Sequence, residues 1–136
     1  MKINTLVFLA VLLTICNLSK CTLKSSKYYA YGADGNKVGY LSSREGDFFN
    51  KNHAYIGTVE KDGSAKNKSG DLLGKANTQS GELLNKDSGE VVAKVDFNSG
   101  NVSSADGTLI GKVDKKDHPK MTRIASGLYF LVLNKN

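Results

Sequence analysis

The residues of this chain with the most evident chemical potential are lysines and asparagines that recur at fixed spacing. One set pairs each asparagine with the lysine after it: Asn50 and Lys51, Asn67 and Lys68, Asn85 and Lys86. A second set consists of Lys75, Lys94 and Lys112, and Arg123 is loosely equivalent to the lysines of the first set. In a symmetric array, rings of like charge could hold an anion or an acidic polymer, and the amides could hydrogen-bond to a sugar. We favour the plainer interpretation, in which these lysines form solvent-facing rows that keep the protein soluble.

Other reactive side chains do not form a recognisable site in the sequence. His53 and His118 both occupy turn positions of different types, so a shared metal site or catalytic pair is not expected. The sequence holds no calcium-loop, nucleophile-elbow or phosphate-loop motif. We therefore predict no catalytic residue, no metal ligand and no cofactor, and a hydrolase is the least favoured class.

Length and charge narrow the possible partners. A chain of 136 residues suits one small domain. Its formal net charge of +6 is spread evenly, whereas nucleic-acid binders gather their basic residues on one face. Nucleic acid is therefore not an expected partner, while an envelope protein or a glycan remains open.

The N-terminal segment has the pattern of an export signal. Lys2 precedes an apolar run at 6–15, which is shorter than the roughly 20 residues of a membrane-spanning helix. We predict a secretion signal over 1–21, a linker over 22–27 and a single domain over 28–134. The alternative is a buried N-terminal helix. Export would place the protein in the periplasm, at the cell envelope or outside the cell.

Both cysteines lie in this segment. Cys16 and Cys21 each follow a sequence that resembles the lipidation box of bacterial lipoproteins, and each departs from it at the residue just before the cysteine. Either is a candidate for lipidation, and simple secretion is favoured over it. Membrane contact is expected only through such an anchor. The domain itself has no cysteine, so its stability must come from packing and backbone pairing.

The remaining chain is an internal repeat. Glycines mark turns at intervals that alternate between a long arm and a short arm, with an average repeat of about 18 residues. The markers are Gly35, Gly46, Gly63, Gly70, Gly81, Gly89, Gly100, Gly107 and Gly127, and His53 and His118 fill the two gaps. Five repeats fit between residues 35 and 126.

The five long arms begin at the turn markers Gly35, His53, Gly70, Gly89 and Gly107. Counted from each marker as the first position, they share three positions, which we call slots. The fourth slot is aliphatic: Val38, Ile56, Leu73, Val92 and Ile110. The fifth slot is always small: Gly39, Gly57, Gly74, Ala93 and Gly111. The seventh slot holds Leu41, Val59, Ala76, Val95 and Val113. Short length, β-branched residues and flanking Asp-Gly and Ser-Gly pairs predict strands, and each repeat then forms one β-hairpin.

The small slot indicates crowding or bending of the backbone. In a regular strand, slots three, five and seven share one face and slot four points to the other. A small residue between larger ones indicates close approach around a common axis, or a bend. We therefore predict a structural ring of small residues in the centre of the array.

Closure of the array is expected from its ends. No helical period persists in the domain, so helix is not expected. The apolar segment 127–133 is predicted to be a strand paired with the N-terminal strand at 28–31, because an open apolar edge would aggregate. The fold class is thus all-β, with five hairpins in a closed pseudo-five-fold array. A left-handed β-helix and an open meander remain alternatives.

These repeats carry a resemblance to a known family. Glycine-punctuated hairpins with an aliphatic-Gly-Lys-Val phrase, behind an export signal, resemble the five-fold β-flower proteins over roughly 28–134. The resemblance implies this fold and an exported bacterial protein, and it implies no known activity. We expect a non-enzymatic structural or binding module of the cell envelope. The alternative is a domain that binds carbohydrate or an anionic polymer through the repeated Lys and Asn positions.

Overall fold

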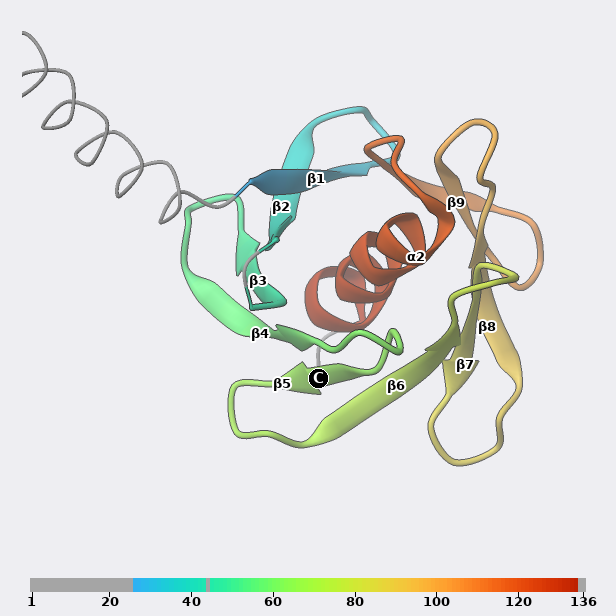
Figure 1. The fold of residues 1–136 in the computed structure, drawn as a ribbon. Coiled ribbons are helices and arrows are strands. Elements are labelled where there is room, and N and C mark those ends of the chain that lie inside the picture. The colour runs from blue at the N-terminus through green and yellow to red at the C-terminus, as the bar shows by residue number, and fades with distance from the viewer. Residues whose placement is uncertain (1–25, 44, 135–136) are drawn as a thin grey trace, which may run out of the picture.

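Ten antiparallel strands form a closed barrel around a C-terminal helix in the computed structural model, which describes residues 26–43 and 45–134 (Figure 1). The strands are β1 (Lys27–Gly32), β2 (Lys37–Ser42), β3 (Asp47–Asn50), β4 (Tyr55–Val59), β5 (Ala65–Asn67), β6 (Leu72–Asn77), β7 (Glu82–Asn85), β8 (Val91–Val95), β9 (Asn101–Ser104) and β10 (Leu109–Val113). The helical segment comprises α2 (His118–Gly127) and a π-helical turn, η1 (Leu128–Leu133). Each strand pairs with its neighbour in sequence, and β1 pairs with β10. The predicted closed array of hairpins is confirmed, and the left-handed β-helix and the open meander are wrong.

Glycines in the left-handed backbone region make the hairpin turns. The eight markers from Gly35 to Gly107 have φ values between 75° and 91°. His53, which fills a gap in this series, has a φ of 67°, a conformation that non-glycine residues adopt at a cost. The series of left-handed turn residues ends at Gly107. Gly127 has a φ of −62°, and His118 begins α2. The last two predicted turn markers are therefore wrong.

Every long arm contains a β-bulge at its fourth slot. The pairing register shifts by one residue there in all five repeats, which leaves Val38, Ile56, Leu73, Val92 and Ile110 without a cross-strand partner. A bulge reverses the alternation of faces. The third slot therefore points outward, the fifth is buried, and the fourth is half-buried against the core. The predictions that slots three, five and seven share a face, and that slot four forms a layer on the opposite face, are wrong for this reason.

The small slots are buried in the wall of the barrel, and three of them contact its helical segment. Gly39, Gly57, Gly74, Ala93 and Gly111 are all buried. A Cβ added at Gly57 would lie 2.6 Å from Leu131 Cδ2, and one at Gly111 would lie 2.7 Å from Leu128 Cδ2. A Cβ at Gly74 would overlap the ring of Phe130. These three glycines thus make room for apolar side chains of the chain's own C-terminal segment. At Gly39, Gly57 and Gly111 an added Cβ would also lie within 2.6 Å of a carbonyl oxygen of a neighbouring strand.

The C-terminal segment is a helical plug, so the predicted strand at 127–133 is wrong, as is the expectation that the domain contains no helix. Ala30 of β1 pairs with both Gly39 of β2 and Val113 of β10. Strand β1 therefore occupies the position between β10 and β2 that a fifth short arm would fill. With that place taken, the segment after β10 has no position in the sheet. Leu128, Phe130 and Leu131 are at most 4% exposed and fill the interior instead.

Polar contacts fix the plug in the barrel. The Asp117 carboxylate caps α2 by accepting a hydrogen bond from the Lys120 backbone N–H at 2.9 Å, and Pro119 follows in the first turn. Arg123 Nη2 donates to the Val59 carbonyl at 2.7 Å, and the buried Ser126 hydroxyl donates to the Gly63 carbonyl at 2.7 Å. Both carbonyls lie at or after the end of β4, so the plug is tied to the wall of the barrel.

Candidate functional site

The repeated asparagines shape the hairpin loops. The Asn50 side-chain carbonyl accepts hydrogen bonds from the backbone N–H groups of Asn52 and Ala54 at 2.9 and 3.0 Å. Asn67 and Asn85 do the same in their own loops, each with two backbone N–H groups. Such bonds stabilise tight turns. Their recurrence therefore has a structural cause, and their carbonyl groups are already engaged.

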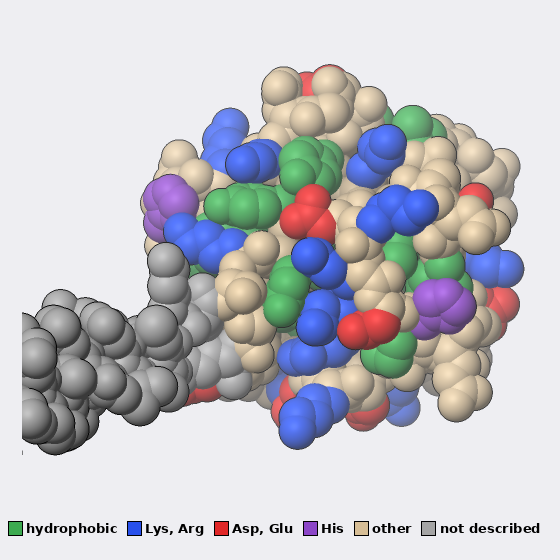
Figure 2. Space-filling model, turned by 45° about the horizontal axis from the view of Figure 1, so that its top comes forward, with side chains coloured by type: hydrophobic (Ala, Val, Ile, Leu, Met, Phe, Trp, Pro, Cys, Tyr) green, Lys and Arg blue, Asp and Glu red, His purple; other side chains and the backbone are tan. Residues whose placement is uncertain are grey.

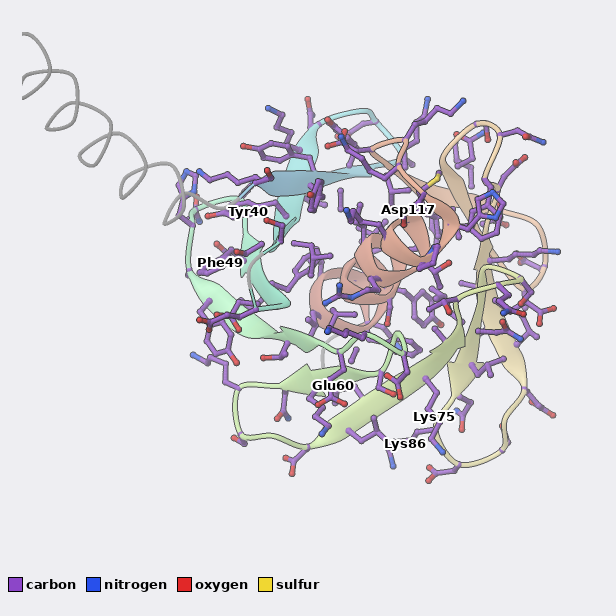
Figure 3. All side chains as sticks on the ribbon, in the orientation of Figure 1. Tyr40, Phe49, Glu60, Lys75, Lys86 and Asp117 are labelled. Carbon is purple, nitrogen blue, oxygen red and sulfur yellow. The ribbon has the colours of Figure 1, made fainter. Side chains whose placement is uncertain are left out.

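The repeated lysines are exposed and do not converge on one site. Lys51, Lys68 and Lys86 lie in three different hairpin loops, and Lys86 forms an ion pair with Asp87 at 3.2 Å. Lys75, Lys94 and Lys112 lie on alternate strands of the wall, so neighbours in this row are about two strand spacings, roughly 10 Å, apart. Figure 3 shows Lys75 and Lys86 on the outer side of the barrel. Arg123 does not belong to these rows, because it projects from α2.

A row of four aromatic side chains crosses the outer face of β1 to β4. Cross-strand pairing places Tyr29 opposite Tyr40, Tyr40 opposite Phe49, and Phe49 opposite Tyr55. The ring centroids are 5.6, 5.1 and 6.1 Å apart along the row, and the central pair is stacked with an interplanar angle of 17°. Figure 3 shows Tyr40 and Phe49 side by side, away from α2. We call Tyr29, Tyr40, Phe49 and Tyr55 the aromatic row.

The bulge of the second repeat completes this row. Because Ile56 is the extra residue, Tyr55 turns outward and meets Phe49, while Phe48 points into the core. Spacing in the sequence alone predicts the opposite face for Tyr55, and our sequence reasoning therefore missed the site. The available signal was the concentration of tyrosine and phenylalanine between residues 28 and 55.

Lysines flank the aromatic row. Lys37 Nζ lies 4.0 Å from the ring centroid of Tyr29, and Lys27 Nζ lies 4.9 Å from that of Tyr40. Ammonium groups over ring faces are held by the ring quadrupole. Among the described residues, the ion pairs involve neither of these lysines.

A hollow of about 220 Å³ opens beside the row. Its lining includes Tyr29, Tyr40, Lys37, Lys51 and His53, and no carboxylate. His53 Nδ1 and the Tyr40 hydroxyl form a hydrogen bond of 3.1 Å, which orients both groups at the edge of the hollow. The left-handed backbone at His53 thus coincides with a polar contact to the row. This hollow combines ring faces, hydroxyl and imidazole groups, and two ammonium groups.

The side of the barrel that carries β1, at the top of Figure 1, comes forward in Figure 2. Hydrophobic side chains lie there among Lys and Arg side chains. His118 is far from His53 in the fold. It begins α2, and its ring stacks on Phe97 with centroids 3.9 Å apart and an interplanar angle of 6°. The two histidines line different hollows.

The described residues contain no group of three or more His, Cys, Asp or Glu side chains placed to hold a metal ion. Within the same part of the chain, no helix has the length and apolar character needed to cross a membrane. Cys16, Cys21 and the predicted signal over 1–21 lie outside the described residues. Comparison of the chain with protein-family models, curated proteins and solved structures finds no match.

Proposed function

We propose that this protein is an exported, non-enzymatic binding module of the bacterial cell envelope, and that it binds carbohydrate on the aromatic row. The observation that carries the proposal is the continuous row of four rings, joined by three ring contacts, on the outside of β1 to β4. Tyr55 is exposed, Tyr29 and Phe49 are half-buried, and Tyr40 is packed between its neighbours with 7% of its surface exposed. Aromatic side chains that gather on the outer face of a sheet, outside the main core, mark an interaction surface. In this barrel the core is filled by α2 and η1, so the row is not needed for the interior.

The chemistry of the row suits a sugar. The C–H face of a pyranose ring packs on an aromatic ring, while its hydroxyls need hydrogen-bonding groups at the margin. The Tyr40 hydroxyl, His53 and the ammonium groups of Lys37 and Lys51 provide such groups around the hollow. A hollow of about 220 Å³ is smaller than the ~300 Å³ at which drug-sized sites begin, so it suits a single sugar residue of a longer chain.

The binding surface differs from the one expected from the repeats. Asn50, Asn67 and Asn85 are engaged in their loops, so the proposal rests on the aromatic row and not on the repeated amides. Of the repeated lysines, Lys51 lines the hollow, and Lys68 and Lys86 do not.

Membership of the five-fold β-flower family is part of the proposal. It is supported by the closed barrel of consecutive hairpins and by the repeat of about 18 residues. Export is supported by the sequence of 1–21. Cell fractionation tests the location, and metabolic palmitate labelling of Cys16→Ser and Cys21→Ser variants tests lipidation. Recovery of the full-length chain in the cytoplasm would contradict export.

The carbohydrate proposal is tested by binding to a glycan array, followed by calorimetry on the ligands found. The variant Phe49→Ala/Tyr55→Ala removes two rings of the row and is expected to weaken binding at least tenfold, about 1.4 kcal/mol. The matched control is Leu84→Ala/Val91→Ala, because these residues occupy the equivalent cross-strand pair two repeats later. The proposal would be wrong if both double variants lost the same affinity, or if Phe49→Ala/Tyr55→Ala bound the glycan as tightly as the parent.

A further inference from the structure

Two more hollows open on the barrel wall beyond the aromatic row, on the side of β10. One, of about 420 Å³, is lined by Tyr31 of β1, Lys112 of β10 and Lys115 after it, among others. The other, of about 600 Å³, is lined by Lys94 of β8, Asn101 of β9 and the stacked pair of Phe97 and His118. Both volumes fall in the range of ligand sites, about 300–1,000 Å³.

The three hollows follow one another around the barrel. The hollow beside the aromatic row lies on β1 and β2, the second on β1 and β10, and the third on β8 and β9. The strand order β2, β1, β10, β9, β8 is continuous in the sheet. Four strand spacings at 4.7–4.9 Å correspond to a path of roughly 20 Å. We call this path the surface track; it is longer than any single sugar residue.

Free positive charge lines the track. Each hollow contributes at least one lysine, and the five are Lys37, Lys51, Lys112, Lys115 and Lys94. None of them belongs to an ion pair found among the described residues. The three ion pairs of that part of the chain instead join Lys66 to Glu60, Lys86 to Asp87 and Lys120 to Asp117.

The two carboxylates on the track are held by the protein itself. Asp114 accepts hydrogen bonds from the Tyr29 backbone N–H at 2.8 Å and from the Tyr31 hydroxyl at 2.9 Å. Asp96 accepts one from the Asn98 backbone N–H at 2.8 Å. These hydrogen bonds orient the carboxylates towards the protein, and the five unpaired lysines outnumber the two carboxylates, so the net charge along the track is positive.

The third hollow also has features that suit a sugar. The planes of Phe97 and His118 provide an aromatic wall, and the side chains of Gln79, Asn98 and Asn101 line the same space. It therefore repeats, at the far end of the track, the combination of rings and polar groups found beside the aromatic row.

We propose that the ligand is an acidic polysaccharide that lies along the surface track and occupies all three hollows. This inference rests on the proposed carbohydrate site at the aromatic row and extends it. The rings bind sugar faces at each end, and the lysines neutralise carboxylate or sulfate groups along the chain. Affinity then increases with chain length until the track is filled, because each further contact is made within one bound molecule.

The test uses the full mature chain and oligogalacturonates of two and eight residues, with calorimetry at low and physiological salt. We expect the octamer to bind at least tenfold more tightly than the dimer, and its affinity to fall as salt increases. The variant Lys112→Gln/Lys115→Gln should weaken octamer binding about tenfold and leave dimer binding within twofold. The control Lys68→Gln/Lys75→Gln, which changes two exposed lysines away from the track, should leave both unchanged.

Equal affinities for dimer and octamer would overturn the track while leaving the site at the aromatic row intact. Loss of binding of both lengths in Phe49→Ala/Tyr55→Ala, with dimer binding retained in Lys112→Gln/Lys115→Gln, separates the two proposals further. Comparison of dextran sulfate with the oligogalacturonate distinguishes sulfate from carboxylate as the anionic group, and neutral dextran is the uncharged control. Tighter binding of either acidic probe than of neutral dextran supports the inference. Binding of dextran as tight as that of both acidic probes would overturn it. So would tighter binding of an oligothymidylate, because that outcome assigns the track to nucleic acid.

Discussion

Replacing Gly74 by valine should expel the ring of Phe130 from the barrel. A Cβ at position 74 overlaps the outer edge of that ring, and Phe130 is only 4% exposed. Added bulk in a packed core usually costs about 1–3 kcal/mol. Here the ring itself has to leave its place, so the cost should approach that of deleting a buried phenylalanine, about 3–5 kcal/mol. For a domain of this size we expect the melting temperature to fall by about 10–25 °C.

The assay is thermal and urea unfolding followed by circular dichroism, with Lys75→Val as the control. Lys75 is the next residue in β6 and is exposed, so the same new side chain there should change stability by no more than about 0.5 kcal/mol. A second variant, Phe130→Ala, removes the ring. In the double variant Gly74→Val/Phe130→Ala, valine occupies space that the ring has left, so the loss should be smaller than the sum of the single losses by about 1 kcal/mol or more. A Gly74→Val variant that melts like the parent, or losses that add, would refute the contact between this slot and the plug.

The remaining predictions concern the turns, the plug and the acid limb of stability. Gly89→Ala should cost about 1–2 kcal/mol in urea unfolding through its φ of 75° alone, because no atom lies within 4 Å of the new methyl group; unchanged stability would contradict this. A chain that ends at residue 116 should lose its cooperative thermal transition, because the barrel interior then lacks the side chains of α2 and η1; a sharp melt would show that the barrel stands without its plug. Hydrogen bonds from the Ser104 hydroxyl and the Thr108 backbone N–H lower the pKa of Asp106 from 3.8 to about 2. Because the pKa is lower in the folded state, this contribution to stability is present above pH 3.8 and is lost as the pH falls towards 2. Asp106→Asn should therefore flatten the pH dependence of the unfolding free energy between pH 3.8 and 2. An NMR titration midpoint near 3.8 for the Asp106 carboxyl would contradict this prediction.

The repeat predicts the wall of the barrel because turns and small slots are local properties. A glycine at the turn position and an aliphatic residue three places later specify a hairpin wherever they occur, so five copies specify the strands and their order. Even His53 was assigned to a turn by its place in the glycine series, and its φ of 67° agrees. Closure follows from the same logic, since an unpaired edge is a liability that a short chain must resolve.

The interior could not be predicted in the same way. The segment 127–133 is as apolar as a buried strand, and its sequence does not separate a strand from a buried helix. Whether 127–133 becomes a strand or a helix depends on β1. Ala30 of that strand pairs with β2 and with β10, so β1 occupies the last position in the sheet. The bulge was a second obstacle, because one extra residue such as Ile56 exchanges inner and outer faces for every residue on one side of it. The aromatic row depends on that exchange and was therefore hidden.

Constancy and variation in the repeat are divided between the two faces of the wall. Inside, the fifth slots stay small, since a side chain at Gly39, Gly57, Gly74 or Gly111 would meet a neighbouring strand or the plug. Outside, the cross-strand pair beside each bulge differs in every repeat: Tyr31 with Lys37, Phe49 with Tyr55, Lys66 with Leu72, Leu84 with Val91, and Ser103 with Leu109. A ligand that required five equal sectors would need these outer pairs to be alike. Because only the sector around Phe49 and Tyr55 carries two rings, recognition is expected where the sequence departs from its own repeat. The same reasoning explains why the evenly repeated asparagines are poor guides to the binding surface, and why only Lys51, Lys94 and Lys112 of the six repeated lysines lie on the surface track.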